Sequence, residues 1–210
     1  MLRLIRFAIC ALVFLPLAVM AGGRDDASDL RRLLAPMENI SANFEQILTG
    51  PDGHVIQRAR GEMAVARPGK VYWHSEAPFE QLIVSDAETL WIYDPDLAQV
   101  TVRPFQRNIR RTPAILFIGE VGDLEAEYRV SAEQLTDNET LYRLEPRGGD
   151  SLFESIAIRF AGGRPSSMVL RDSMGQETRI ELSGVEINGD IASSRFQFEP
   201  PAGVDILRDD

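Results

Sequence analysis

The spacing of apolar residues changes from a helical period to an alternation near residue 40. Over residues 25–39 one apolar stripe recurs at near-helical spacing and consists of Leu30, Leu33, Leu34 and Met37. Ser28 or Asp29 is a suitable N-cap for this helix. Pro36 should end or kink the helix near Ala35, because proline lacks the amide donor that a helix interior needs.

Beyond residue 40 apolar and polar residues alternate, as they do in strands with one apolar face. Proline and glycine interrupt the alternation and predict short turns, for example at residues 51–53 and 67–69. The pattern predicts about a dozen strands in an antiparallel meander. They are expected at residues 40–48, in a second strand ending at Ala66, and at residues 71–76, 81–85, 89–93, 99–103, 127–131, 141–145, 153–160, 167–172, 177–187 and 195–199.

The number of strands constrains the fold class. A long antiparallel sheet must curl or close to protect its edges, and strands do not alternate with helices as they would in a parallel sheet. We therefore expect a mainly β protein with a few helices. Its sheet should be a strongly curved, unclosed antiparallel β-barrel, and the helices at residues 25–39 and 112–118 should cover the concave face.

The short segment at residues 112–118 has the signals of a helix. Thr112 is a suitable N-cap, Pro113 occupies the first helical position and Gly119 follows the end. Its apolar residues are consecutive, so nearly every face of the helix is apolar, with Ile115, Phe117 and Ile118 among them. Such a segment is either ordinary core or a mobile lid that exchanges contacts between the protein and a lipid, and we favour the lid.

Residues 1–21 are typical of a secretory signal peptide. Arg3 and Arg6 precede an apolar run at residues 7–19, and small residues end the segment at Ala21. The apolar run is short for a membrane-spanning helix. We therefore expect cleavage after Ala21 and secretion rather than a membrane anchor.

The remaining chain, residues 22–210, is expected to form one domain and to act as a monomer. Cys10 is the only cysteine and lies inside the signal peptide, so the mature chain would have no thiol and no lipid anchor. Cleavage removes two of the 22 basic residues and none of the 32 acidic ones, so the net charge changes from −10 to −12. An acidic protein is repelled by nucleic acids and by anionic membranes, so nucleic acid is not an expected partner and a specific partner would be needed to approach a bilayer.

The sequence contains no recognisable catalytic or cofactor motif. It has no G-x-S-x-G, H-E-x-x-H, Walker or dinucleotide-binding pattern. The two histidines, His54 and His74, fall in separate predicted strands without a ligand motif, and solvent-facing roles are favoured over metal binding. Paired carboxylates fall at turns and termini, where aspartate suits the backbone geometry. We therefore expect no enzyme activity, no metal and no cofactor.

The predicted strands between residues 71 and 93 carry an excess of apolar side chains. Val71 and Trp73 share a face of the first of these strands, Leu82 and Val84 share a face of the second, and Trp91 lies on the third. If an even number of residues separates the first two strands, these side chains fall on the same side of the sheet. They would then either form an ordinary core or, together with Leu33 and Met37 of the first helix, line a cavity that two helices leave unfilled.

Arg67 ends a strand after Val65 and Ala66 and precedes Pro68-Gly69. An arginine at a strand end is usually solvated. The alternative is an arginine at the mouth of an apolar cavity, where its five donors hold carbonyl oxygens of a loop or of a helix end.

An ordered set of segments resembles one known family. The segments are Arg67-Pro68-Gly69-Lys70-Val71-Tyr72-Trp73, Leu82-Ile83-Val84-Ser85-Asp86, Leu90-Trp91-Ile92-Tyr93-Asp94-Pro95, Gln99-Val100-Thr101-Val102, Thr112-Pro113-Ala114, Asp172-Ser173-Met174-Gly175-Gln176 and Phe196-Gln197-Phe198-Glu199-Pro200-Pro201-Ala202-Gly203-Val204-Asp205. The chain is similar to the LolA family of periplasmic lipoprotein carriers from the signal peptide to near the C-terminus. Two departures are Val71, where an aromatic residue is common, and the turn at residues 86–88, which lacks a frequent glycine.

The resemblance implies an unclosed barrel with a helical lid over an apolar cavity. It also implies a function and partners. The carrier would accept acylated lipoproteins from an ATP-driven transporter of the inner membrane and deliver them to an outer-membrane acceptor. Arg67 would bond to lid backbone and favour the closed, empty state. The alternatives are a periplasmic sensor or chaperone of the same fold without transfer activity and, third, a periplasmic hydrolase.

Overall fold

The computed structural model describes residues 25–105, 117, 124–148, 151 and 153–208. The predicted signal peptide and the predicted short helix, apart from Phe117, lie outside these residues. Ile115 and Ile118 therefore also lie outside them.

Helix α1 spans Asp26–Leu34 and ends before Pro36, as the sequence predicts. Its N-cap is Asp25, so the prediction of Ser28 or Asp29 was wrong. The Asp25 carboxylate accepts hydrogen bonds from the Ser28 amide at 3.4 Å and from the Ser28 hydroxyl at 2.6 Å. This cap provides an acceptor for an amide that has no partner within the helix.

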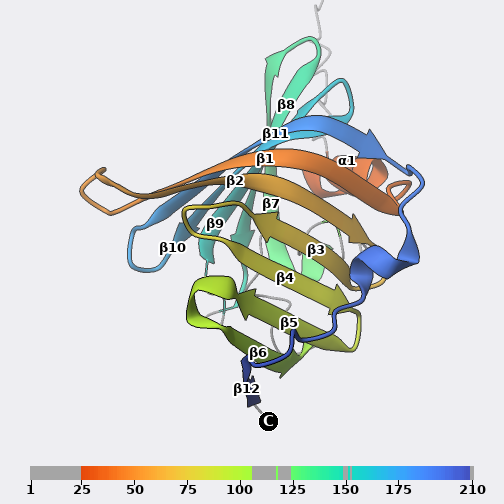
Figure 1. The fold of residues 1–210 in the computed structure, drawn as a ribbon. Helices are drawn as coiled ribbons and strands as arrows, with labels where there is room; N and C mark the ends of the chain where they lie inside the picture. Colours follow the sequence, from red (N-terminus) through yellow and green to blue (C-terminus); the bar gives the residue numbers. More distant parts are fainter. Residues whose placement is uncertain (1–24, 106–116, 118–123, 149–150, 152, 209–210) are drawn as a thin grey trace, which may run out of the picture.

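In the described part of the chain, twelve strands form one sheet in the order β12-β6-β5-β4-β3-β2-β1-β11-β10-β9-β8-β7 (Figure 1). They are β1 (Asn39–Thr49), β2 (Val55–Ala66), β3 (Lys70–Ser75), β4 (Gln81–Asp86), β5 (Thr89–Asp94), β6 (Gln99–Pro104), β7 (Tyr128–Thr136), β8 (Glu139–Pro146), β9 (Phe153–Ala161), β10 (Arg164–Asp172), β11 (Glu177–Ile187) and β12 (Asp205–Arg208). The short helices are η1 (Pro95–Leu97), α4 (Leu124–Glu127) and η4 (Ser193–Phe196).

Strand β1 joins the two halves of the chain at the middle of the sheet. Ile40 pairs with Val65 of β2 on one side and with Ile187 of β11 on the other. Strands β12 and β7 are the two edges and do not pair with each other, so the predicted unclosed sheet is confirmed. Two pairings differ from the expected meander: β1 lies beside β11, and β12 runs parallel to β6.

The predicted strand at residues 195–199 was wrong. This part of the chain forms the end of η4 and an extended segment that crosses the outside of the sheet (Figure 1). The alternation of Phe196 and Phe198 therefore reflects packing of both rings against the sheet rather than strand pairing. Arg195 anchors the segment: its guanidinium contacts the Glu62 carboxylate at 2.6 Å and lies 4.4 Å from the centre of the Tyr72 ring.

We call the two sides of the sheet the inner face, which carries Phe44 and Trp73, and the outer face. On the inner face the Phe44 and Trp73 rings stack with their centres 4.2 Å apart. The alternation in β9 is confirmed, since Ile156, Ile158 and Phe160 are all buried in the same hydrophobic cluster. The inner face thus carries the main core.

Leu82, Val84 and Trp91 lie on the outer face, so the condition under which they would share a side with Val71 and Trp73 is not met and they do not line the cavity with them. Five residues, an odd number, separate β3 from β4. Trp73 therefore pairs with Ile83, which places Ile83 on the inner face and its neighbours Leu82 and Val84 on the outer face. On the outer face Val84 is buried, and the Trp91 ring lies 6.4 Å from that of Phe198. Strands β4 and β5 thus carry apolar residues on both faces, and the C-terminal segment covers the outer one.

Truncation of the stacked pair should destabilise the fold. Phe44 is 2% exposed, and Phe44→Ala should lower the free energy of unfolding by about 3–5 kcal/mol because it leaves a cavity in the core. Urea denaturation followed by circular dichroism measures this change. Leu97→Ala is the control, since Leu97 is 68% exposed and its loss should change stability by less than about 0.5 kcal/mol. Equal effects of the two substitutions would contradict this assignment of the core.

Candidate functional site

One end of the inner face is filled by α1. Leu30 and Leu34 of the helix are buried in the same cluster as Phe44, Met63 and Val65 of the sheet. Met37, after the helix, and Phe117 belong to this cluster, and Leu33 packs against it. Figure 1 shows α1 beside the start of β1, whereas the β1–β2 hairpin tip lies at the opposite end.

A cavity of about 630 Å³ lies on the inner face toward that opposite end. Its apolar lining includes Val71, Trp73 and Ile83, and its polar lining includes the amides of Gln46, Gln57 and Gln81. The cavity is therefore amphipathic, with apolar side chains on several strands and polar side chains beside the turns. Its volume is in the range of sites that hold small organic ligands.

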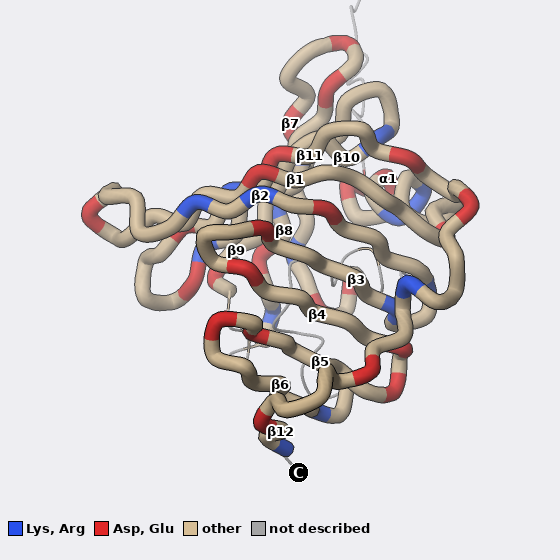
Figure 2. Tube along the Cα trace, viewed as in Figure 1, with Lys and Arg blue, Asp and Glu red and all other residues tan. Residues whose placement is uncertain are grey.

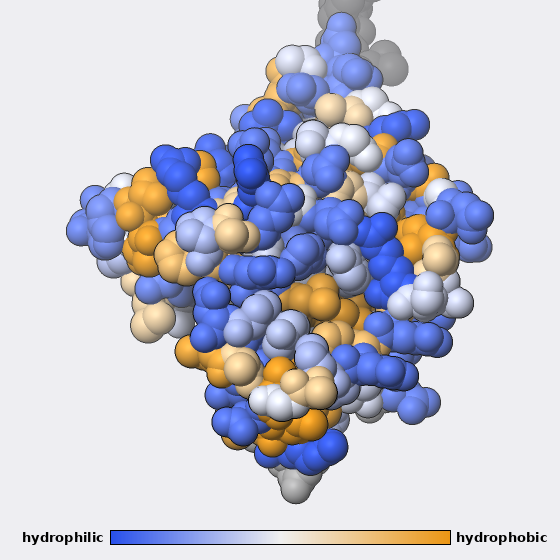
Figure 3. All heavy atoms as spheres, in the orientation of Figure 1, coloured by the Kyte–Doolittle hydropathy of each residue, from blue (hydrophilic) through white to orange (hydrophobic). Residues whose placement is uncertain are grey.

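Exposed apolar side chains surround this end of the molecule. Phe79 and Leu97 line the cavity and are 54% and 68% exposed. Val55 and Ile56, at the start of β2, are also exposed. Figure 3 shows apolar surface at the left, over the β1–β2 hairpin and the turn after β5. Acidic residues, by contrast, occupy many of the turns and hairpin tips (Figure 2).

Arg67 joins three separate parts of the chain at the α1 end of the inner face. Its Nε donates to the Phe117 carbonyl oxygen and its Nη1 to the Leu34 carbonyl oxygen, both at 3.1 Å. The Leu34 carbonyl belongs to the last turn of α1, where a cation is also favoured by the helix dipole. Arg67 thus contacts a helix end instead of standing in solvent, as the second arrangement considered from sequence requires, although it does not line the cavity.

Burial of Arg67 has an electrostatic consequence. Loss of hydration lowers the pKa of its guanidinium from the ordinary value. A guanidinium titrates only above about pH 12, so the side chain still carries its charge at neutral pH. Its Nη2 is buried and has no hydrogen-bond partner among the described residues. Two hydrogen bonds to carbonyl oxygens therefore hold the Arg67 guanidinium, which is partly removed from water.

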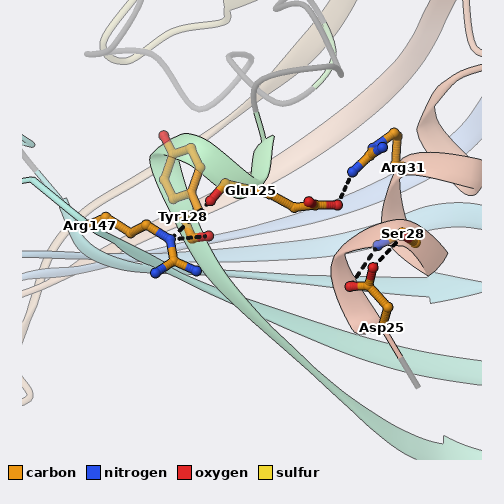
Figure 4. A network of polar contacts seen from close by, with 6 residues as sticks. All are labelled: Asp25, Ser28, Arg31, Glu125, Tyr128 and Arg147. Carbon is orange, nitrogen blue, oxygen red and sulfur yellow. Dashed lines mark hydrogen bonds and ion pairs between the residues drawn. The ribbon is translucent and has the colours of Figure 1, made fainter. Parts of the chain in front are cut away.

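A second set of polar contacts holds α1 to α4 (Figure 4). Arg31 of α1 forms an ion pair with Glu125 of α4. Arg147 donates through Nε to the Glu125 carbonyl oxygen at 3.0 Å and to the Tyr128 carbonyl oxygen at 3.2 Å. The N-terminal helix is thus held at two points, by Arg67 at its C-terminus and by Arg31 near its middle.

The structure brings some of the sequence-predicted residues together and separates others. Val71 and Trp73 line the cavity, while Met37, Leu33 and Phe117 belong to or pack against the core at its α1 end. Sequence reasoning missed the cavity-lining residues Ile83, Leu170, Phe153 and the three glutamines. Ile83 could have been found only from the register, because it alternates with the outer-face residues Leu82 and Val84.

Comparison with known proteins supports one assignment. The family profile described as outer membrane lipoprotein carrier protein LolA matches residues 35–199. A protein named outer-membrane lipoprotein carrier protein from Chromohalobacter salexigens is 42% identical over 204 residues, which cover 96% of this chain and 95% of that protein. A protein of the same name from Alcanivorax borkumensis is 40% identical over 184 residues, or 88% of each chain. This chain belongs to the LolA family.

The fold of this LolA family member is also found in a solved structure. An uncharacterized conserved protein from Thermus thermophilus matches it with a TM-score of 0.55, and the match covers 87% of this chain and 99% of that chain. The two sequences are 10% identical, so the likeness concerns the arrangement of the strands and not the residues of the cavity.

The histidines do not assemble a site in the described part of this family member. His54 contacts Asp52 in the β1–β2 hairpin, and His74 Nε2 lies 3.2 Å from a Glu80 carboxylate oxygen. Among the described residues no three His, Cys, Asp or Glu side chains are grouped as metal ligands would be. No helix in the same residues is long and apolar enough to cross a membrane.

Proposed function

We propose that this protein is a periplasmic carrier that binds the acyl chains of lipoproteins released from the inner membrane and delivers them to an outer-membrane acceptor. The names of its relatives support this proposal. The structural observation that carries it is the cavity of about 630 Å³ on the inner face, where Val71, Trp73 and Ile83 offer an apolar surface. Binding and release, rather than catalysis, are the roles that such a surface suits.

The energetics of acyl chains agree with a carrier. Each methylene group hidden from water stabilises the bound state by about 0.8 kcal/mol, so a sixteen-carbon chain gains about 12 kcal/mol at most. Movement of the chain from a bilayer to a cavity gains little, because both surroundings are apolar. Loading therefore needs work from outside, which an ATP-driven transporter of the inner membrane would supply.

Release needs a carrier that binds less tightly than its acceptor. Arg67 serves this need if its bonds to Leu34 and Phe117 exist only when the cavity is empty. The closed state then competes with the loaded one and weakens cargo binding. In this proposal α1 and the segment around Phe117, with Ile115 and Ile118, form the lid.

A transfer assay separates the carrier from a sensor or chaperone of the same fold. Donor vesicles containing the inner-membrane transporter, purified protein and acceptor vesicles are combined, and radiolabelled lipoprotein is followed with ATP present. A carrier moves label to the acceptor in proportion to its concentration. Binding without movement would favour the sensor or chaperone, and hydrolysis of the acyl esters would favour an enzyme.

The proposed location depends on cleavage of the signal peptide. We expect protein purified from the periplasm to begin at Gly22, since residues 1–21 have the charged, apolar and small-residue order of a signal peptide. Intact-mass spectrometry gives the answer directly. A mass that includes residues 1–21, or an acylated N-terminus, would contradict the prediction.

A further inference from the structure

The inner face changes from apolar to polar along its strands. Toward α1 the inward positions are apolar, for example Phe44 in β1, Trp73 in β3 and Ile83 in β4. At the cavity end five strands turn a neutral polar side chain inward, namely Gln46, Gln57, Ser75, Gln81 and Thr178. Pairing of Ser75 with Gln81 confirms that these two share a face. The inner face therefore has an apolar part and a polar part, in which these five side chains are neutral and Asp94 of β5 is charged.

We call Gln46, Gln57 and Gln81 the amide belt. Each is half-buried, and each carboxamide has two N–H donors and one acceptor oxygen. Gln81 uses Nε2 to donate to an Asp94 carboxylate oxygen at 2.7 Å. The Gln46 and Gln57 amides have no hydrogen-bond partner among the described residues. Donors therefore remain available toward the cavity.

The outer face differs at the same end of the sheet. Glu45 directly precedes Gln46 and Arg58 directly follows Gln57, so both lie on the outer face. Arg60 and Arg179 lie nearby on that face. On β1 and β2 the outward positions here thus carry charges, whereas the inward positions Gln46 and Gln57 carry uncharged amides. A hydrocarbon chain has no acceptor for the N–H donors of the amide belt. If it covered them and left them without partners, its binding would be weaker. The amide belt therefore suits a ligand that places hydrogen-bond acceptors beside these three amides.

The charged residues around the amide belt further restrict the chemical class of the ligand. Glu80, Asp94 and Asp96 also line the cavity, so a carboxylate or phosphate head group would meet like charges. Ester and amide carbonyls are uncharged acceptors and suit the amides. We propose that the amide belt holds the ester and amide carbonyls that join the acyl chains of a lipoprotein to its N-terminal residue, while the chains lie over Val71, Trp73 and Ile83. This assignment rests on the proposed carrier function.

The test compares two synthetic lipopeptides that differ only in the two ester carbonyls. One carries two palmitoyl chains ester-linked to an S-glyceryl cysteine peptide, and the other has ether links of the same length. Fluorescence anisotropy of a dye on the peptide gives the two dissociation constants. Because several neutral hydrogen bonds are lost with the ether, the wild-type protein should bind the ester about tenfold more tightly.

Substitution of the belt should remove the preference without removing binding. The triple variant Gln46→Leu, Gln57→Leu, Gln81→Leu should bind both lipopeptides alike, and the ether at least as tightly as the wild type does. The control is Glu45→Leu, Arg58→Leu, which alters the outer face of the same two strands and should keep the tenfold preference. The single variant Gln57→Leu should show an intermediate preference and answers the question if the triple variant does not fold.

The outcomes separate this assignment from the carrier function. Equal binding of ester and ether by the wild type, or a preference that persists in the triple variant, would overturn the belt while leaving the carrier in place. Failure of the wild type to bind either lipopeptide would overturn both. A second probe pair tests the charges: methyl palmitate should bind more tightly than palmitate at pH 7, and the reverse order would also overturn the assignment.

Discussion

Arg67→Leu is expected to accept lipoprotein from the inner-membrane donor at the normal rate but to release it to the acceptor about tenfold more slowly, or worse. The substitution removes the bonds to the Leu34 and Phe117 carbonyl oxygens. A hydrogen bond from a charged group is worth roughly 1.5–3 kcal/mol, and that energy would be lost only from the closed, empty state. The loaded state gains by the same amount relative to the closed one. Uptake and hand-over, measured as separate half-reactions, show the effect.

Two further variants test the reason for this result. Arg67→Lys should be partly competent, because an ammonium group cannot span two carbonyls as the planar guanidinium does. Arg164→Leu is the matched control: Arg164 also donates to a backbone carbonyl, that of Val185 at 3.0 Å, but on β10. It should leave both half-reactions unchanged. Normal hand-over by Arg67→Leu would show that Arg67 is structural and that release is controlled elsewhere.

Ile83→Glu is expected to weaken binding of acylated cargo by about 100-fold or more. Ile83 lines the cavity on the inner face opposite Trp73. Acyl chains would have to cover a carboxylate without a partner, and burial of an unpaired charge costs several kcal/mol. Titration with a fluorescent diacylated peptide measures the dissociation constant, and circular dichroism shows whether the fold is retained.

Leu82→Glu is the control for this effect because it changes the adjacent residue to the same side chain. Leu82 lies on the outer face and pairs with Tyr93. Cargo binding should therefore stay within about twofold of the wild type, which is a few tenths of a kcal/mol. If the two variants lose binding equally, or if Ile83→Glu binds cargo normally, the ligand does not occupy the inner-face cavity.

Local pattern was sufficient for much of the secondary structure. Pro36 and the spacing of Leu30 and Leu34 predicted the extent of α1, and the alternation in β9 predicted its buried face. Gly53 takes the positive φ, 81°, that the predicted turn requires. These features depend on neighbours in the sequence, through backbone sterics and hydrogen bonds of short range. The unclosed sheet also followed, because so many antiparallel strands with few helices must curl.

The faces of the sheet depend on register, which local pattern does not supply. Strands β4 and β5 carry apolar residues on both sides, since the C-terminal segment covers one side and the core lies on the other. Alternation could therefore not show that Ile83 faces the cavity and Leu82 does not. An odd number of residues in one turn made that choice.

The sequence by itself determined the class of fold, the strand pattern and a lone arginine that had two possible environments. Only the tertiary structure decided between them, because the partners of Arg67 lie 33 and 50 residues away. The same holds for the amide belt, whose glutamines come from three strands and meet only when the sheet curves. Contacts of this kind depend on how distant segments pack, and packing is a property of the whole chain rather than of any window within it.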